Sequence, residues 1–101
     1  MHREEVLRLA FIQDVEEVME RLYQDIAHID QKEADEEIIH LLYALRLAAI
    51  SYDERYLKKK IEKTLAAMLN RREHQTEQMV TMLYDLADAI VYPVKYTALA
   101  S

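Results

Sequence analysis

The chain contains no glycine and a single proline, Pro93, among its 101 residues. Glycine normally supplies the left-handed residues of tight hairpin turns and of many helix ends, and a sheet-rich fold needs many such turns. The sequence is rich instead in residues of high helix propensity, such as Leu, Ala, Glu, Lys, Arg and Met. We therefore expect an all-α protein.

The overall composition is that of a globular chain. Apolar residues make up 51% of the sequence and charged residues 32%, a balance typical of folded rather than disordered proteins. The length suits one domain over residues 1–101. Cysteine is absent, which excludes disulfides and thiolate sites and agrees with a reducing compartment. The N-terminal residues have no secretory pattern, so we expect a cytoplasmic protein.

Apolar residues recur at spacings of three and four along four segments, a pattern that predicts amphipathic helices. The predicted helices cover about residues 3–29, 33–51, 54–70 and 75–92, followed by a tail, 93–101. Short polar connections indicate an antiparallel four-helix bundle in up-down-up-down order, with the first helix the longest. The residues predicted to face inward are Phe11, Val15, Val18, Leu22, Ile26, Ile29, Ile38, Leu42, Leu45, Ala49, Leu57, Ile61, Leu65, Met68, Leu69, Met79, Leu83, Leu86, Ala87 and Ile90.

Two connections contain capping-box patterns, an Asp or Ser followed three residues later by Glu. Asp30 with Glu33 and Ser51 with Glu54 would begin the second and third helices in this way. The first predicted helix would be about 40 Å long at about 1.5 Å per residue, longer than its neighbours. We therefore expect it either to bend or to project beyond the bundle.

The second predicted helix is apolar on nearly every side, which indicates contacts on more than one face. Its segment at 41–50, LLYALRLAAI, is too short to span a membrane and is interrupted by Arg46. A desolvated and unpaired guanidinium would cost several kcal/mol. We expect Arg46 to pair with Asp14 or Asp25; the alternative places it at the centre of an interface patch, together with Tyr43 and Leu47.

Seven tyrosines accompany one Phe and no Trp. Tyr43 and Tyr84 fall at the edges of apolar arcs, and Tyr92 and Tyr96 belong to an apolar C-terminal stretch. Tyrosine suits such a boundary because its ring is apolar and its hydroxyl is polar, and it is enriched at protein interfaces. We predict that these four residues contribute to partner binding, although ordinary packing at the edge of the core is the alternative.

The third predicted helix carries a basic ridge that includes Lys59, Lys60 and Lys63. Such a ridge could dock on an anionic membrane or on nucleic acid. The net charge of −6 opposes nucleic-acid binding, which usually goes with an excess of positive charge. A solvated helix face is the simpler interpretation, and we expect no nucleic-acid partner.

Two acid-x-x-His patterns, Asp25 to His28 and Glu37 to His40, resemble half of a di-metal bundle site. A helical wheel places His40 nearly opposite the core, however, and the later helices supply no suitable inward glutamate. Carboxylates and hydroxyls are not gathered as catalysis requires. We expect a non-enzymatic protein with no catalytic, cofactor-binding or metal-binding residues.

The length, the antiparallel layout and the short tail are similar to those of the small four-helix immunity proteins of bacteriocin producers. This resemblance is architectural and involves no residue motif, so it offers only an example of what such a domain can do. We predict a binding protein of the adaptor, regulator, inhibitor or immunity type that forms a homodimer. Docking of the basic ridge and a metal-using bundle enzyme are the alternatives.

Overall fold

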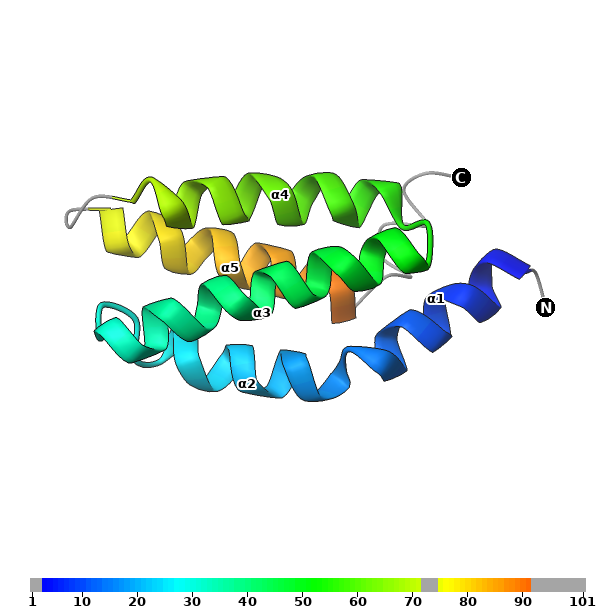
Figure 1. Ribbon diagram of the computed structural model, residues 1–101, viewed down its shortest axis with the longest axis horizontal. Coiled ribbons are helices and arrows are strands. Elements are labelled where there is room, and N and C mark those ends of the chain that lie inside the picture. Colours follow the sequence, from blue (N-terminus) through cyan, green and yellow to red (C-terminus); the bar gives the residue numbers. More distant parts are fainter. Residues whose placement is uncertain (1–2, 72–74, 92–101) are drawn as a thin grey trace.

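The computed structural model describes residues 3–71 and 75–91, which contain five helices and no strand (Figure 1). The helices are α1 (Arg3–Asp14), α2 (Glu16–Ile26), α3 (Lys32–Ser51), α4 (Arg55–Leu69) and α5 (Thr76–Val91). The predicted all-α class is confirmed. The prediction that the first helix is the longest is wrong, because the segment predicted as one helix is divided into α1 and α2, and α3 is the longest with 20 residues.

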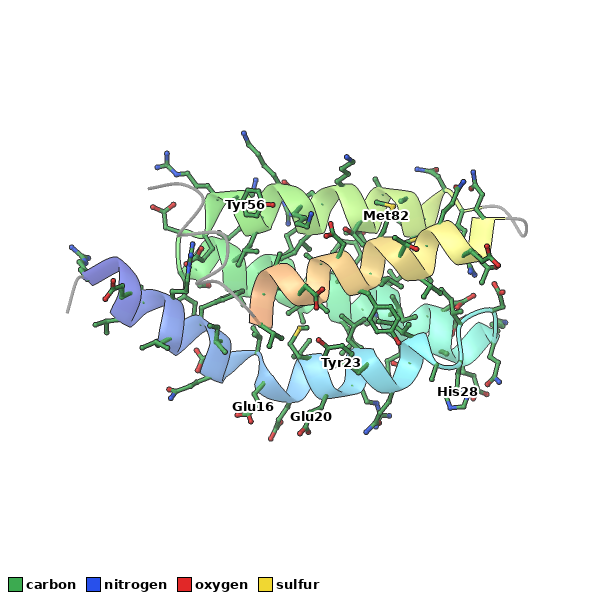
Figure 2. All side chains as sticks on the ribbon, turned by 180° about the vertical axis from the view of Figure 1, so that it is seen from behind. Glu16, Glu20, Tyr23, His28, Tyr56 and Met82 are labelled. Carbon is green, nitrogen blue, oxygen red and sulfur yellow. The ribbon has the colours of Figure 1, made fainter. Side chains whose placement is uncertain are left out.

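Helices α2 to α5 lie side by side and alternate in direction (Figure 1). In Figure 1, α3 is in front, with α4 on one side of it and α2 on the other, while α5 lies behind. Figure 2 shows the same arrangement from behind, with α5 now in front. Helix α3 packs against both α2 and α4, and α5 packs against α4 and, less extensively, α2. One face of α3 therefore points away from the rest of the protein.

The division between α1 and α2 is a bend at Val15, where the backbone has φ −100° and ψ 5°. The Val15 N–H still donates to the Phe11 carbonyl at 3.1 Å, and the Met19 N–H donates to Val15 at 2.8 Å. The chain thus changes direction while these backbone groups remain paired. On either side of the bend, Phe11 on α1 and Leu22 on α2 are both fully buried in the core.

The core consists of the inward stripes of all five helices, and periodicity predicted most of its members. Phe11, Leu22, Ile38, Leu42, Leu45, Ala49, Ile61, Leu83, Leu86 and Ala87 are fully buried. Val18 and Ile29 are only partly buried. Leu69, also predicted to face inward, is exposed at the end of α4.

The turns use aspartate where glycine would be usual. Asp30 and Asp53 have φ values of 81° and 55°, in the left-handed region that Asp tolerates better than most residues. The predicted capping boxes are wrong, because Gln31 and Glu54 occupy the N-cap positions without a capping side-chain hydrogen bond. Ser51, predicted to cap α4, instead donates its hydroxyl to the Leu47 carbonyl at 3.0 Å.

Ion pairs join the connections at both ends of the bundle. Arg71, just after α4, donates to Asp30 at 2.6 Å and to Asp35 at 2.5 Å, which ties the α2–α3 turn to the end of α4. At the other end, Arg8 of α1 reaches Glu54 at 3.1 Å. Glu54 is buried, so this pair fixes α1 against the α3–α4 turn.

Candidate protein-binding surface

The face of α3 that points away from the bundle carries three large exposed apolar residues. Tyr43, Leu47 and Ile50, which we call the outer stripe, are 46%, 63% and 45% exposed. Their spacings of four and three residues keep them on one side of the helix. Burying such a stripe against a partner would remove apolar surface from water, which is the main favourable contribution to protein association.

Sequence reasoning identified Tyr43 and Leu47 as candidate contact residues but did not include Ile50. The information was in the sequence: residues 43, 47 and 50 follow the spacing of a coiled-coil seam. They were difficult to separate from the core because nearly every side of this helix is apolar. The core stripe of α3, which includes Leu42 and Leu45, is fully buried on the opposite face.

Arg46 pairs with a residue of α4, beside the outer stripe. Its Nε donates to Glu62 Oε2 at 2.9 Å, and Lys58 Nζ donates to Glu62 Oε1 at 3.2 Å. The hydrogen bond from Arg46, together with that from Lys58, holds the pKa of Glu62 below its ordinary value. The Arg46 side chain is 34% exposed, so it remains accessible to a partner.

The expected pairing of Arg46 with Asp14 or Asp25 is wrong. Both aspartates belong to α1 and α2, whereas Arg46 points to the side of α3 where α4 lies. Asp14 instead accepts a hydrogen bond from the Tyr52 hydroxyl. A helical wheel gives the angle of a residue around its own helix but does not say which neighbouring helix lies on that side.

Two further surface features lie on α4 and at the α3–α4 turn. Leu69 follows Glu62 by two turns on the same side of α4 and is exposed. At the other end of the stripe lies a surface hollow of ≈ 360 Å³. The hollow is lined by Ala49, Ile50, Asp53, Glu54, Arg55, Lys58 and Lys59.

The other predicted aromatic residues lie elsewhere. Tyr84 on α5 is exposed, and its ring centroid is 6.3 Å from that of Tyr23 on α2. Tyr23 lies where α2 and α5 meet, on the side of the molecule turned toward the viewer in Figure 2. Tyr92 and Tyr96 fall outside the described residues.

The predicted basic ridge is divided by ion pairing. Lys60 Nζ lies 2.6 Å from Asp85 of α5, and Lys58 pairs with Glu62. Lys59 and Lys63 are exposed on α4, and neither forms an ion pair with a residue in the described ranges. These two lysines, which we call the basic edge, hold the charge still available to a partner.

An acidic edge lies on α2, across α3 from the basic edge. It consists of Glu16, Glu17 and Glu20, all exposed. Figure 2 shows Glu16 and Glu20 pointing away from the bundle. Helix α2 is joined to α3 by Arg21, which donates two hydrogen bonds to Glu37. The outer surfaces of α2 and α4 thus carry opposite charge.

A pair of carboxyl groups, Asp25 on α2 and Glu37 on α3, lies beside that contact. Burial and a hydrogen bond with Glu37 raise the pKa of Asp25 from 3.8 to about 6. The hydrogen bond from Arg21 lowers the pKa of Glu37. Asp25 Oδ2 is buried without a partner among the described residues. The raised pKa of Asp25 links the electrostatics of the pair to pH.

The two histidines of the acid-x-x-His patterns, His28 and His40, are exposed. Across residues 3–71 and 75–91, no group of three or more His, Asp and Glu side chains is placed to hold a metal ion.

Over the same ranges, no helix has the length and apolar character needed to cross a membrane. No protein-family model, curated protein or solved structure matches this chain.

Proposed function

We propose that this chain is a non-enzymatic protein-binding protein of the cytoplasm. It would act as an adaptor, regulator, inhibitor or immunity-type factor, would associate with itself, and would contact its partner through the outer stripe of α3. The observation that carries the proposal is the exposure of Tyr43, Leu47 and Ile50 together on one face of the most central helix.

The chemistry of this face supports a protein partner. Full burial of a side chain the size of leucine contributes roughly 1.5–3 kcal/mol, so three such residues form a substantial apolar centre. Tyr and Arg are the residue types most enriched at energetically dominant interface positions. Arg46 is already held by Glu62 at 2.9 Å, so a partner would need to order less of its side chain.

In this proposal the molecule works as an antiparallel four-helix bundle in which α1 and α2 together form one bent arm. The bend at Val15, whose N–H and carbonyl both remain hydrogen-bonded, supports this description. Helices α2, α4 and α5 then form the scaffold that presents α3. A site built on a rigid helix holds its side chains more precisely than a site on a loop.

Docking of the basic edge on an anionic membrane or nucleic acid is less well supported. The exposed Lys59 and Lys63 favour it, but Lys58 and Lys60 are paired with carboxylates. The chain as a whole carries a net charge of −6, which would oppose approach to a polyanion. Binding of the wild-type chain to anionic vesicles or DNA at low salt, lost in the variant K59E/K63E, would favour this alternative instead.

Photo-crosslinking in the native host tests the proposed function. A photoreactive phenylalanine analogue would replace Leu47 in one variant and Asp88, an exposed residue of α5, in the matched control. We expect discrete protein adducts from position 47, with this chain or with another protein, and none of the same adducts from position 88. Adducts that are absent at position 47, or identical at both positions, would overturn the proposal.

A further inference from the structure

We infer that the contact between Asp25 of α2 and Glu37 of α3 is a pH-sensitive latch. It holds the N-terminal arm of the protein, which consists of α1 and α2, against α3 (Figure 1). At acidic pH a proton held by the two carboxyl groups keeps the latch closed. As the pH rises toward neutrality this proton is lost, and the arm opens more readily from α3, α4 and α5. The inference does not depend on the outer stripe.

The latch brings two carboxyl groups to one guanidinium. Arg21 donates from Nε and Nη2 to the two carboxyl oxygens of Glu37. Asp25 follows Arg21 by one turn on the same face of α2, and its carboxyl group forms a hydrogen bond with that of Glu37. Two carboxyl groups can form such a bond only when one of them carries a proton, because a carboxylate is an acceptor only. The contact therefore requires a proton.

The surroundings of Asp25 also favour its protonated form. Its Oδ2 atom is buried and has no hydrogen-bond partner among the described residues, so ionisation would place negative charge where no donor compensates it. The Arg21 guanidinium, which could compensate it, is engaged by Glu37. In agreement with this geometry, burial and the hydrogen bond with Glu37 raise the pKa of Asp25 from 3.8 to about 6. The latch thus titrates in a range where ordinary aspartates are already ionised.

Three basic side chains oppose protonation of the latch. Among the described residues, Arg21 and His28 of α2 favour the charged form of Asp25, and Arg21 and His40 favour that of Glu37. Both histidines are exposed, so water weakens their effect. The pKa of Asp25 is raised in spite of these groups, because burial and the contact with Glu37 outweigh them.

The latch lies at the main attachment of the arm. Helix α2 packs extensively against α3 and less extensively against α5, while α3, α4 and α5 pack on one another in turn. On the α5 side, the ring of the titratable Tyr84 meets that of Tyr23. Tyr23 precedes Asp25 by two residues and therefore lies on a different side of α2. Loss of the latch thus weakens the contact that holds the arm and leaves α3, α4 and α5 packed together.

Linkage gives the direction and the size of the effect. When the arm opens, Asp25 enters water and its pKa returns toward 3.8. The stabilisation of the closed arm is complete below that value and is lost as pH rises through about 6. We therefore expect the equilibrium constant for opening to rise roughly tenfold between about pH 5 and about pH 7.5, since one pKa unit corresponds to about a tenfold change in an equilibrium constant.

Native-state amide hydrogen exchange, corrected for the intrinsic pH dependence of exchange, measures this opening helix by helix. In wild type, the α2 amides should exchange through a more populated opening than the α4 amides, and this opening should show the roughly tenfold rise with pH. The variant Asp25→Asn should keep α2 equally protected at both pH values. The matched control Glu20→Gln, which replaces an exposed carboxylate of α2, should behave like wild type.

Two results of this experiment would count against the inference. Opening of α2 that does not change with pH in wild type, or that changes equally in Asp25→Asn, would overturn the latch. Equal protection of α2 and α4 would overturn the separate opening of the arm, because the whole chain would then unfold together.

Carbon-13 NMR of the side-chain carboxyl groups tests the shared proton directly. Asp25 and Glu37 should both respond to one titration step at a pH of about 6, and the Glu37 signal should lose this step in Asp25→Asn. Two independent titrations at ordinary carboxyl pKa values would show that no proton is shared and would overturn the latch.

Discussion

The replacement Asp25→Asn should make the protein more stable near neutral pH and less sensitive to pH. Burial and the hydrogen bond with Glu37 favour the protonated form of Asp25, so its pKa in the folded state is about 6 rather than 3.8. Asparagine keeps a neutral hydrogen-bond donor next to Glu37 but cannot ionise. Arg21 remains in place to pair with Glu37.

The sign and the magnitude follow from linkage. Between about pH 4 and pH 6 the folded state holds a proton on Asp25 that the unfolded state releases, so this group's contribution to stability falls as pH rises. A pKa difference of roughly two units corresponds to about 3 kcal/mol. Because the Asp25 side chain is partly exposed, solvent screening reduces the expected gain for Asp25→Asn near pH 7.5 to ~1–2 kcal/mol.

The assay is urea unfolding followed by circular dichroism at pH values from about 4 to 7.5, a window set by the ordinary and raised pKa values. The control is Asp88→Asn, which replaces an exposed carboxylate on α5. We expect the difference in unfolding free energy between Asp25→Asn and wild type to grow as pH rises. The difference between Asp88→Asn and wild type should stay the same across this pH range. An Asp25→Asn variant that is less stable than wild type at pH 7.5, or equally stable throughout, would refute this reasoning.

Three further substitutions separate core, turn and surface. Leu42→Ala should destabilise the fully buried core by about 3 kcal/mol through lost apolar contact and the cavity it leaves; a loss below about 1 kcal/mol in urea unfolding would contradict the packing of α3. Glu54→Gln should cost about 1–2 kcal/mol by weakening the pair with Arg8, and an unchanged unfolding midpoint would show that this contact contributes little. Leu47→Lys should change the stability of the monomer by less than about 0.5 kcal/mol; a large loss would place Leu47 in the core.

Periodicity predicted the buried faces well because burial depends on the angle of a residue around its own helix. Leu42 and Leu83 show this, since both were placed inward and both are fully buried. The bend at Val15 was not located, since neither proline nor glycine is present there. On either side of the bend, Phe11 and Leu22 are both fully buried in the core.

The candidate surface was only partly predictable, for a related reason. Which neighbour lies on each side of α3 depends on how the helices are placed in space, so the pairing of Arg46 with Glu62 could not be chosen over pairing with Asp14. For the same reason, the sequence did not show which lysines of the basic ridge would form ion pairs. Lys60 pairs with Asp85, while Lys63 remains exposed.

The most direct test of the outer stripe as a contact surface is sedimentation velocity of the full chain from low micromolar to submillimolar concentration. Wild type should shift from the 12.0 kDa monomer to a dimer as concentration rises. Leu47→Lys should remain a monomer, and the matched control Leu9→Lys, which alters a 52% exposed leucine on α1, should behave like wild type. A wild-type chain that stays monomeric throughout, or a Leu47→Lys variant that dimerises as well as wild type, would contradict this assignment.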